Sequence, residues 1–250
     1  MTTVSFVSTI HIPILPETPP FEILEEIGEG ETAKVYKAKN AHGQIVALKC
    51  FFTKEEWMQR VLQATLDDPN FQIFLNYQFK ENGLVQEAIS EFEIAKKLDH
   101  PHIVKILDSF VDKNGVHTLV LEFVDGKKME GFSSIDPKLK LQLLDTLIYI
   151  HDQGFVHEDL YSDNFMTEEG NLKMIDLGSL TPIEDAPITL KEYAKHIAVF
   201  ANIDKSYFSE MPKDEVTEEN LKGLQKILCQ LREQFKTEFQ QAAYKTRCDL

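Results

Sequence analysis

The chain has 250 residues, of which 43% are hydrophobic and 27% are charged, and its formal net charge is −15 at pH 7. This length and balance suit a soluble globular protein with one large core, or one with two lobes that share a cleft. The acidic excess argues against a protein that binds nucleic acid, because cationic contacts to phosphate groups supply most of that affinity. It argues equally against binding to an anionic membrane surface.

Targeting and redox features point to a cytoplasmic protein. No apolar run approaches the roughly 20 residues that a membrane-spanning helix needs. The first residues also lack the basic stretch of a secretory signal. The three cysteines, Cys50, Cys229 and Cys248, show no metal-ligand spacing, so we expect reduced thiols.

The first half of the chain is dominated by strand-like patterns. Residues 1–20 alternate apolar and polar side chains and end in Pro19-Pro20, which suggests an arm or an edge strand. Predicted strands follow at residues 21–28, 34–40, 44–52, 105–111 and 117–124. Residues 53–83 interrupt them as an insertion with some helix, and apolar residues at helical spacing predict a helix over 84–98.

The second half is predicted to be mostly helical. Asp136 and Pro137 suit the N-cap and first position of a helix that ends at Gly154. Thr217 suits the N-cap of a later helix, whose apolar stripe consists of Leu221, Leu224, Ile227, Leu228, Leu231, Phe235 and Phe239. Two interpretations of this stripe remain open. It packs on a shortened helical lobe, or its far end docks an activating partner protein.

Four local patterns carry candidate chemistry, and the first is a turn with two glycines, Gly28 and Gly30. Glycines there allow backbone N–H groups to approach phosphate oxygens without an intervening side chain. An ordinary hairpin turn is an alternative, and Ala33 replaces a third glycine. A Rossmann site does not fit, because a strand and not a helix follows the glycines.

The second pattern is Lys49 in the apolar segment 46–49. A buried lysine is costly without a partner, and we expect Glu91 of the next helix to be that partner. A solvent-facing lysine is the alternative. Glu87 and Glu93 compete with Glu91 but are expected on a solvated helix face.

The third and fourth patterns place polar side chains in and after loops. Asp159 and Asn164 lie five residues apart in a polar loop, where a carboxylate can accept a proton and an amide oxygen can bind a metal ion. His157 is expected to bond the loop backbone without performing chemistry. Asp176 ends an apolar strand just before Gly178, where it could bridge Mg²⁺ to nucleotide phosphates.

These four patterns occur in the order typical of eukaryotic protein kinases, and residues 100–110 and 150–160 add to the match. From about residue 21 to about residue 178 the chain therefore resembles that family. The resemblance implies an α+β fold with a five-stranded antiparallel N-lobe and a reduced, mostly helical C-lobe. It divides the chain into an arm (1–20), an N-lobe (21–124) with the insertion at about 53–83, and a C-lobe (125–250).

The resemblance also implies a role for each matching residue. Gly28 and Gly30 would cover the phosphates of ATP, and Lys49, paired with Glu91, would hold the α- and β-phosphates. Asp159 would be the catalytic base, and Asn164 and Asp176 the Mg²⁺ ligands. Adenine would be held by the hinge residues Glu122 and Val124 and by Val35, Ala47 and Met166, although a core role suits these three apolar residues equally well.

Besides Ala33, the chain departs from the family pattern in three places. Glu158 stands where the family commonly has arginine, so it cannot pair with a phosphorylated activation loop. Tyr161 replaces the lysine that serine/threonine kinases usually carry. Only 72 residues (250 minus 178) follow Gly178, and the sequence Ala186-Pro187-Ile188 comes too early to close a normal activation segment. Similar truncation is known among kinase-like bacterial effectors, which would place this protein in a host cytosol, and among atypical kinases.

The function that we expect is ATP- and Mg²⁺-dependent transfer of the γ-phosphate to a serine or threonine hydroxyl of a protein. A small-molecule kinase is the alternative within enzymes. A nucleotide-binding pseudokinase or an AMP-transferring enzyme is the alternative on the same fold.

Overall fold

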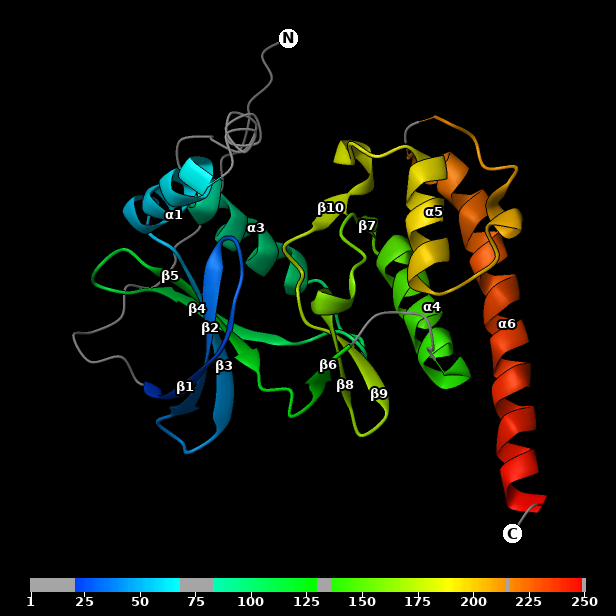
Figure 1. Ribbon diagram of the computed structural model, residues 1–250, viewed down its shortest axis with the longest axis horizontal. Helices are drawn as coiled ribbons and strands as arrows, with labels where there is room; N and C mark the ends of the chain where they lie inside the picture. The colour runs from blue at the N-terminus through cyan, green and yellow to red at the C-terminus, as the bar shows by residue number, and fades with distance from the viewer. Residues whose placement is uncertain (1–20, 68–82, 130–135, 215, 249–250) are drawn as a thin grey trace. The chain divides into compact units, whose positions relative to one another are not determined.

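The computed structural model describes residues 21–67, 83–129, 136–214 and 216–248 (Figure 1). The expected N-terminal arm and the second half of the predicted insertion lie outside these ranges. The chain divides into two compact units, the first made of Met1–Phe92 and Ile106–Phe123 and the second of Glu93–Lys105 and Val124–Leu250. No helix within the described ranges is long and apolar enough to span a membrane.

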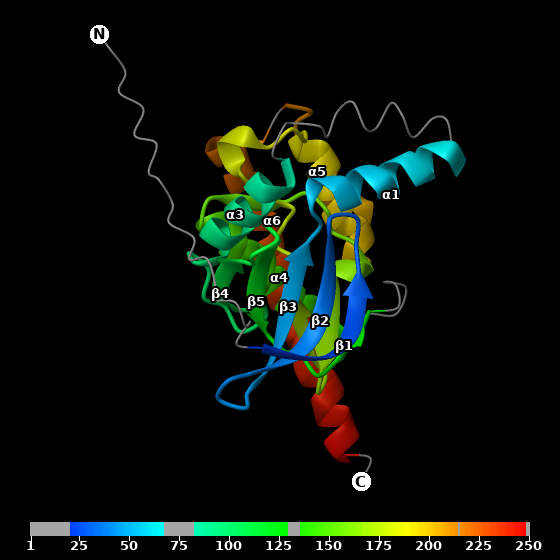
Figure 2. The same ribbon diagram turned by 90° about the vertical axis from the view of Figure 1, so that its left-hand side faces the viewer.

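The first unit is built on a five-stranded antiparallel sheet in the order β1-β2-β3-β5-β4 (Figure 2). Its strands are β1 (Phe21–Glu29), β2 (Ala33–Asn40), β3 (Ile45–Phe51), β4 (Ile106–Val111) and β5 (His117–Glu122). Gly43 and Gly115 have positive φ angles of 79° and 82° in the turns before β3 and β5, a conformation that favours glycine. The predicted strands and turns are confirmed.

The two faces of this sheet carry different residues. One face holds a small apolar cluster of Ala38, Val46, Leu48, Phe110 and Val120. Phe21 stacks on Phe110 beside it, with ring centroids 5.6 Å apart. Residues that pair directly across antiparallel strands share a face. The pairing of Val35 with Lys49 and of Lys49 with Leu119 therefore places these three on the other face.

Two helices accompany the sheet, α1 (Lys54–Asp67) and α3 (Gly83–Ala95). Helix α1 lies inside the predicted insertion and confirms its helical part. Helix α3 ends three residues earlier than the predicted helix over 84–98. Backbone bonds from Lys97 to Ile94 and from Leu98 to Ala95 tighten its end into a turn ahead of Pro101.

The second unit is mostly helical. Its long helices are α4 (Pro137–Asp152), α5 (Leu190–Phe200) and α6 (Glu218–Cys248), and its short 3-10 helices are η1 (Ser162–Asn164), η2 (Ile183–Asp185) and η3 (Lys205–Phe208). Two small antiparallel sheets join β6 (Lys127–Lys128), β8 (Phe165–Glu168) and β9 (Asn171–Met174), and β7 (Phe155–His157) with β10 (Leu180–Pro182). A sheet-based unit followed by this helical one confirms the α+β fold.

Helix α4 begins and ends as its sequence predicts. The Asp136 side chain accepts a hydrogen bond from the backbone N–H of Lys138, and Pro137 takes the first position. Gly154 follows the helix with a positive φ of 84°. Four apolar side chains of α4 are almost fully buried: Leu143, Leu144, Leu147 and Ile150.

Helix α6 packs against α4, as Figure 1 shows. Thr217 caps α6, because its hydroxyl accepts from the backbone N–H of Asn220. The side chains of α6 that are buried in the described part of the chain are Leu221, Leu224, Leu228, Leu231 and Phe235. Arg232 forms an ion pair with Asp145 of α4. The predicted stripe therefore forms part of the core of this unit as far as Phe235.

Phe235 and Phe239 provide a matched pair for testing α6. Phe235 is 6% exposed, whereas Phe239 is 37% exposed. Fully burying a phenylalanine contributes about 1.5–3 kcal/mol, so Phe235→Ser should lower the melting temperature by several degrees and Phe239→Ser should lower it by clearly less. Scanning calorimetry measures both, and equal losses would contradict this division of the helix.

Candidate active site

The glycine turn connects β1 and β2. Neither Gly28 nor Gly30 has a positive φ, and a Cβ added to either would meet no atom closer than 3.8 Å. The fold itself therefore does not require glycine at either position, and glycine costs conformational entropy. A ligand that approaches the backbone closely would still explain glycine at these two positions.

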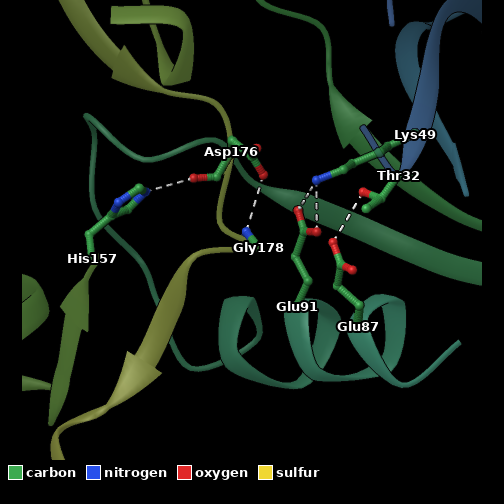
Figure 3. Close-up of polar contacts among 7 residues, drawn as sticks. All are labelled: Thr32, Lys49, Glu87, Glu91, His157, Asp176 and Gly178. Atoms are coloured by element: carbon green, nitrogen blue, oxygen red, sulfur yellow. Dashed lines mark hydrogen bonds and ion pairs between the residues drawn. The ribbon is translucent and has the colours of Figure 1, made fainter. Parts of the chain in front are cut away.

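Side chains hold this turn to the helices of the first unit. The hydroxyl of Thr32 donates to Glu87 of α3 over 3.1 Å (Figure 3). Arg60 of α1 forms an ion pair with Glu29, which lies between the two glycines. Glu87 was expected on a solvated helix face, and its side chain is half-buried and accepts the bond from Thr32. No pattern in the sequence pairs these two residues.

Lys49 and Glu91 form a buried ion pair. The Lys49 Nζ atom lies 3.0 and 2.8 Å from the two carboxylate oxygens of Glu91, and Figure 3 shows the contact. The Lys49 side chain is 12% exposed and that of Glu91 is 0% exposed. The expected pairing is confirmed, and the solvent-facing alternative for Lys49 is wrong. Glu93 instead pairs with Lys96 on the surface, as expected.

The residues expected around adenine are divided between the two units. Val35 and Ala47 lie on the same sheet face as Lys49, and Ala47 is buried. Glu122 ends β5 in the first unit. Val124 and Met166 belong to the second unit, Val124 buried and Met166 half-buried in β8.

The polar loop after β7 brings Asp159 and Asn164 together. The Asn164 side-chain NH₂ donates to the backbone oxygen of Asp159 over 2.8 Å and to its carboxylate over 2.7 Å. Both bonds use the amide nitrogen of Asn164, so they fix the plane of the amide group and leave its oxygen out of these two contacts. The backbone oxygen of Asn164 also accepts from the N–H of Ile175, next to Asp176.

His157 organises the backbone of the same loop. The N–H of Asp159 donates to Nδ1 of His157 over 3.3 Å, and Nε2 lies 3.0 Å from the backbone oxygen of Asp176 (Figure 3). A backbone N–H only donates and a carbonyl only accepts, so the ring is neutral and carries its proton on Nε2. Burial lowers the pKa of His157. This arrangement supports the predicted structural role of His157.

Asp176 follows β9 and is half-buried. Its carboxylate accepts from the N–H of Gly178 over 3.1 Å (Figure 3). Mg²⁺ takes oxygen ligands and commonly needs only one or two protein groups beside substrate phosphates. An amide oxygen from Asn164 and the carboxylate of Asp176 fit that donor set. Within the described ranges, no group of three or more His, Cys, Asp or Glu side chains is placed to hold a metal ion by itself.

The segment after Asp176 is short and closes onto β7. Strand β10 pairs with β7 so that Leu180 lies opposite His157, and Ile183 N–H bonds the backbone oxygen of Gly154. Helix α5 starts at Leu190, where Thr189 and Glu192 form a capping box. Residues 186–188 therefore lead directly into α5.

Glu158 is half-buried beside this segment, and its Oε1 atom is buried with no hydrogen-bond partner among the described residues. Burial raises the pKa of Glu158, while a hydrogen bond from Thr181 opposes the shift. The charged form is therefore disfavoured in the folded state. The destabilisation should be fully present above the folded-state pKa and absent below the ordinary pKa of about 4.5.

Glu158→Gln should consequently raise the melting temperature at pH 7, because it removes a charge that folding desolvates. The difference from the unsubstituted protein should shrink as the pH falls and disappear below about pH 4.5. Melting curves across this range check the prediction. A stabilisation that grew at low pH would contradict the sign of the pKa shift.

The sequence did not predict a role for two further residues in this unit. Tyr193 of α5 and His151 of α4 are buried and form a side-chain hydrogen bond of 2.8 Å. Tyr193 also contacts the backbone N–H of His157. Buried apolar periodicity predicted neither polar group. An isolated tyrosine and an isolated histidine carry no motif that could have pointed to the contact.

Comparisons with known proteins agree with this geometry. The mouse (Mus musculus) protein "Sperm motility kinase Tcr mutant form" is 32% identical over 168 residues, which is 63% of this chain and 29% of that protein. The rat (Rattus norvegicus) "Serine/threonine-protein kinase 10" is 30% identical over 169 residues, 63% of this chain and 15% of that protein. The chain thus matches less than a third of either relative. Both are mammalian, so the resemblance to bacterial effectors stays a prediction. The family model for the protein kinase domain matches residues 21–196, more than half of the chain, and the chain therefore belongs to the protein kinase family.

Proposed function

We propose that this protein uses ATP and Mg²⁺ to transfer the γ-phosphate to a serine or threonine hydroxyl of a protein acceptor. The observation that carries the proposal is the buried pair of Lys49 and Glu91. Buried ion pairs are weak contributors to stability, and apolar replacements are often as stable. Because the pair adds little stability, a lysine held on an apolar sheet face is better explained by a role in binding phosphate.

Each candidate residue has a role in this proposal. Lys49 binds the α- and β-phosphates, and the backbone at Gly28 and Gly30 covers the phosphate chain. Asp159 accepts the proton of the attacking hydroxyl while the bond from the γ-phosphorus to the bridging oxygen breaks and ADP leaves. Asn164 orients the Asp159 carboxylate through its 2.7 Å bond. Adenine contacts are assigned to Val35, Ala47, Glu122, Val124 and Met166.

Asn164 and Asp176 would hold Mg²⁺, which when bound neutralises charge on the phosphate oxygens. The polar loop after β7, which carries Asp159 and Asn164 and is here called the catalytic loop, adds little positive charge itself. Tyr161 is exposed and stands where a lysine is usual. His157 is neutral, because Nδ1 accepts from the Asp159 N–H. Fewer cations around the transferring phosphate predict a low intrinsic rate.

The short segment 177–189 favours a second candidate, a kinase for a small hydroxylated molecule. That segment leads directly into α5 and leaves little chain for a peptide-docking platform. The serine/threonine-kinase relative favours a protein acceptor.

A cytoplasmic location suits the free thiols Cys50 and Cys229. An activating partner would dock at the exposed Phe239, and a lysate assay of Phe239→Ser tests this proposal.

The chemistry is tested with ATP labelled at the γ or, separately, at the α position. Each is incubated with Mg²⁺, the full chain and a panel of protein and small-molecule acceptors. Transfer of the γ label to an acceptor supports a kinase. Transfer of the α label would contradict the kinase proposal and indicate an AMP transferase. Transfer of neither label, with ATP binding intact, would favour a pseudokinase.

A further inference from the structure

A buried chain of hydrogen bonds links helices α4 and α5 to the start of the catalytic loop. The Tyr193 side chain is fully buried, and its hydroxyl lies 2.8 Å from Nε2 of His151. The backbone N–H of His157 donates to the same hydroxyl oxygen over 3.5 Å. The rings of His151 and Tyr193 meet edge to face with centroids 5.6 Å apart. The hydroxyl is thus held between the last turn of α4 and the residue that ends β7.

The roles in these bonds follow from the groups involved. The His157 N–H can only donate, so the Tyr193 oxygen accepts it. Which group donates between the Tyr193 hydroxyl and Nε2 of His151 depends on the tautomer of the ring. Burial lowers the pKa of His151 to about 3, and burial also raises the pKa of Tyr193. Both groups are therefore neutral throughout the physiological range.

The same residue, His157, positions the proposed base. Its backbone N–H receives the Tyr193 contact, and its ring accepts from the N–H of Asp159 two residues later. The ring is also tied to the backbone of Asp176. A shift of the His157 backbone would therefore move Asp159 relative to the rest of the loop, and small misplacements of a reacting group cost rate.

We propose that the Tyr193 hydroxyl, held by His151, is a positioning group that fixes His157 and thereby orients Asp159 for proton transfer. The inference rests on the proposed phosphoryl transfer. It adds residues of α4 and α5 to the groups that act on Asp159. Buried polar groups are costly to leave without partners, and loss of the hydroxyl would remove the acceptor of the His157 N–H.

Tyr193→Phe removes the hydroxyl and keeps the ring. Losing one neutral hydrogen bond should lower kcat about fivefold to tenfold. The KM for ATP should change less than about twofold, because the nucleotide ligands are untouched. Steady-state kinetics well below the melting temperature measure both constants.

Tyr149→Phe is the matched control. The Tyr149 hydroxyl also accepts from a backbone N–H, that of Asp99 over 2.7 Å, and its ring stacks on His100. Tyr149→Phe should lower stability and leave kcat unchanged. A merely structural Tyr193 would give the two variants the same kcat, and that result would overturn the inference.

Amide hydrogen exchange tests the inference without relying on activity. The amides of His157 and Asp159 should exchange about fivefold to tenfold faster in Tyr193→Phe and at the original rate in Tyr149→Phe. Unchanged exchange in a folded Tyr193→Phe protein would overturn the positioning role. An inactive unsubstituted protein would instead overturn the proposed function, so the two failures are distinguishable.

A second pair of variants applies if Tyr193→Phe does not fold. His151→Leu removes the partner of the hydroxyl, whereas the amide of His151→Gln can replace it. The leucine variant should show the faster exchange at His157, and the glutamine variant should stay near the original rate. Equal exchange in the two folded variants would contradict the inference.

Discussion

Asp159→Asn is expected to lower phosphoryl transfer by about 10²–10⁴-fold, the range typical of a lost general base. The substitution keeps the size of the side chain, and an amide oxygen can still accept the hydrogen bond from Asn164. Binding of ATP with Mg²⁺ should therefore stay within about twofold of the original value. Transfer of the γ-phosphate and calorimetric ATP titration measure the two effects separately.

Two carboxylates provide matched controls for this substitution. Asp163→Asn removes an exposed charge from the same loop and should leave the rate nearly unchanged. Asp176→Asn should lower the rate and also weaken Mg²⁺-dependent ATP binding, because Asp176 is a proposed metal ligand. Full activity in Asp159→Asn would show that the catalytic loop has been assigned wrongly.

Lys49→Ala should destabilise the folded protein as well as remove ATP binding. It takes away the cation that is bonded to the fully buried Glu91 carboxylate. Removing one member of a buried ion pair costs about 3–5 kcal/mol. The melting temperature should fall, and ATP with Mg²⁺ should no longer raise it, since only a ligand that binds the folded state stabilises it.

A double substitution separates the two effects of Lys49. In Lys49→Met/Glu91→Leu both charges are replaced by apolar groups, so most of the stability should return. The stabilisation by ATP should not return, because the lysine that binds the phosphates is still absent. An ATP-dependent shift in the double variant would place the nucleotide elsewhere in the chain.

The parts of this protein that the sequence predicts well are those set by local rules. Asp136, Pro137 and Gly154 bound α4 because capping and turn preferences act within a few residues. Alternation and turn glycines likewise define the strands of the first unit. The pair of Lys49 and Glu91 was expected because a buried lysine needs a partner, although the sequence also left a solvent-facing lysine open.

Contacts between distant polar residues were not predictable in this way. Glu87 belongs by sequence to a solvated helix face, yet it binds Thr32, which is 55 positions away. The bond between Tyr193 and His151 spans 42 positions and joins two helices. Such contacts depend on how the elements pack, and no periodicity in the chain encodes them.

Phosphoamino-acid analysis after incubation with γ-labelled ATP tests the central claim most directly. The full chain, Mg²⁺ and protein acceptors are incubated with and without a chelator, and the labelled protein is hydrolysed to amino acids. The account predicts label on phosphoserine or phosphothreonine that depends on Mg²⁺ and is absent with Asp159→Asn. Label that forms equally with the chelator, or that never appears on a hydroxyl amino acid, would contradict it.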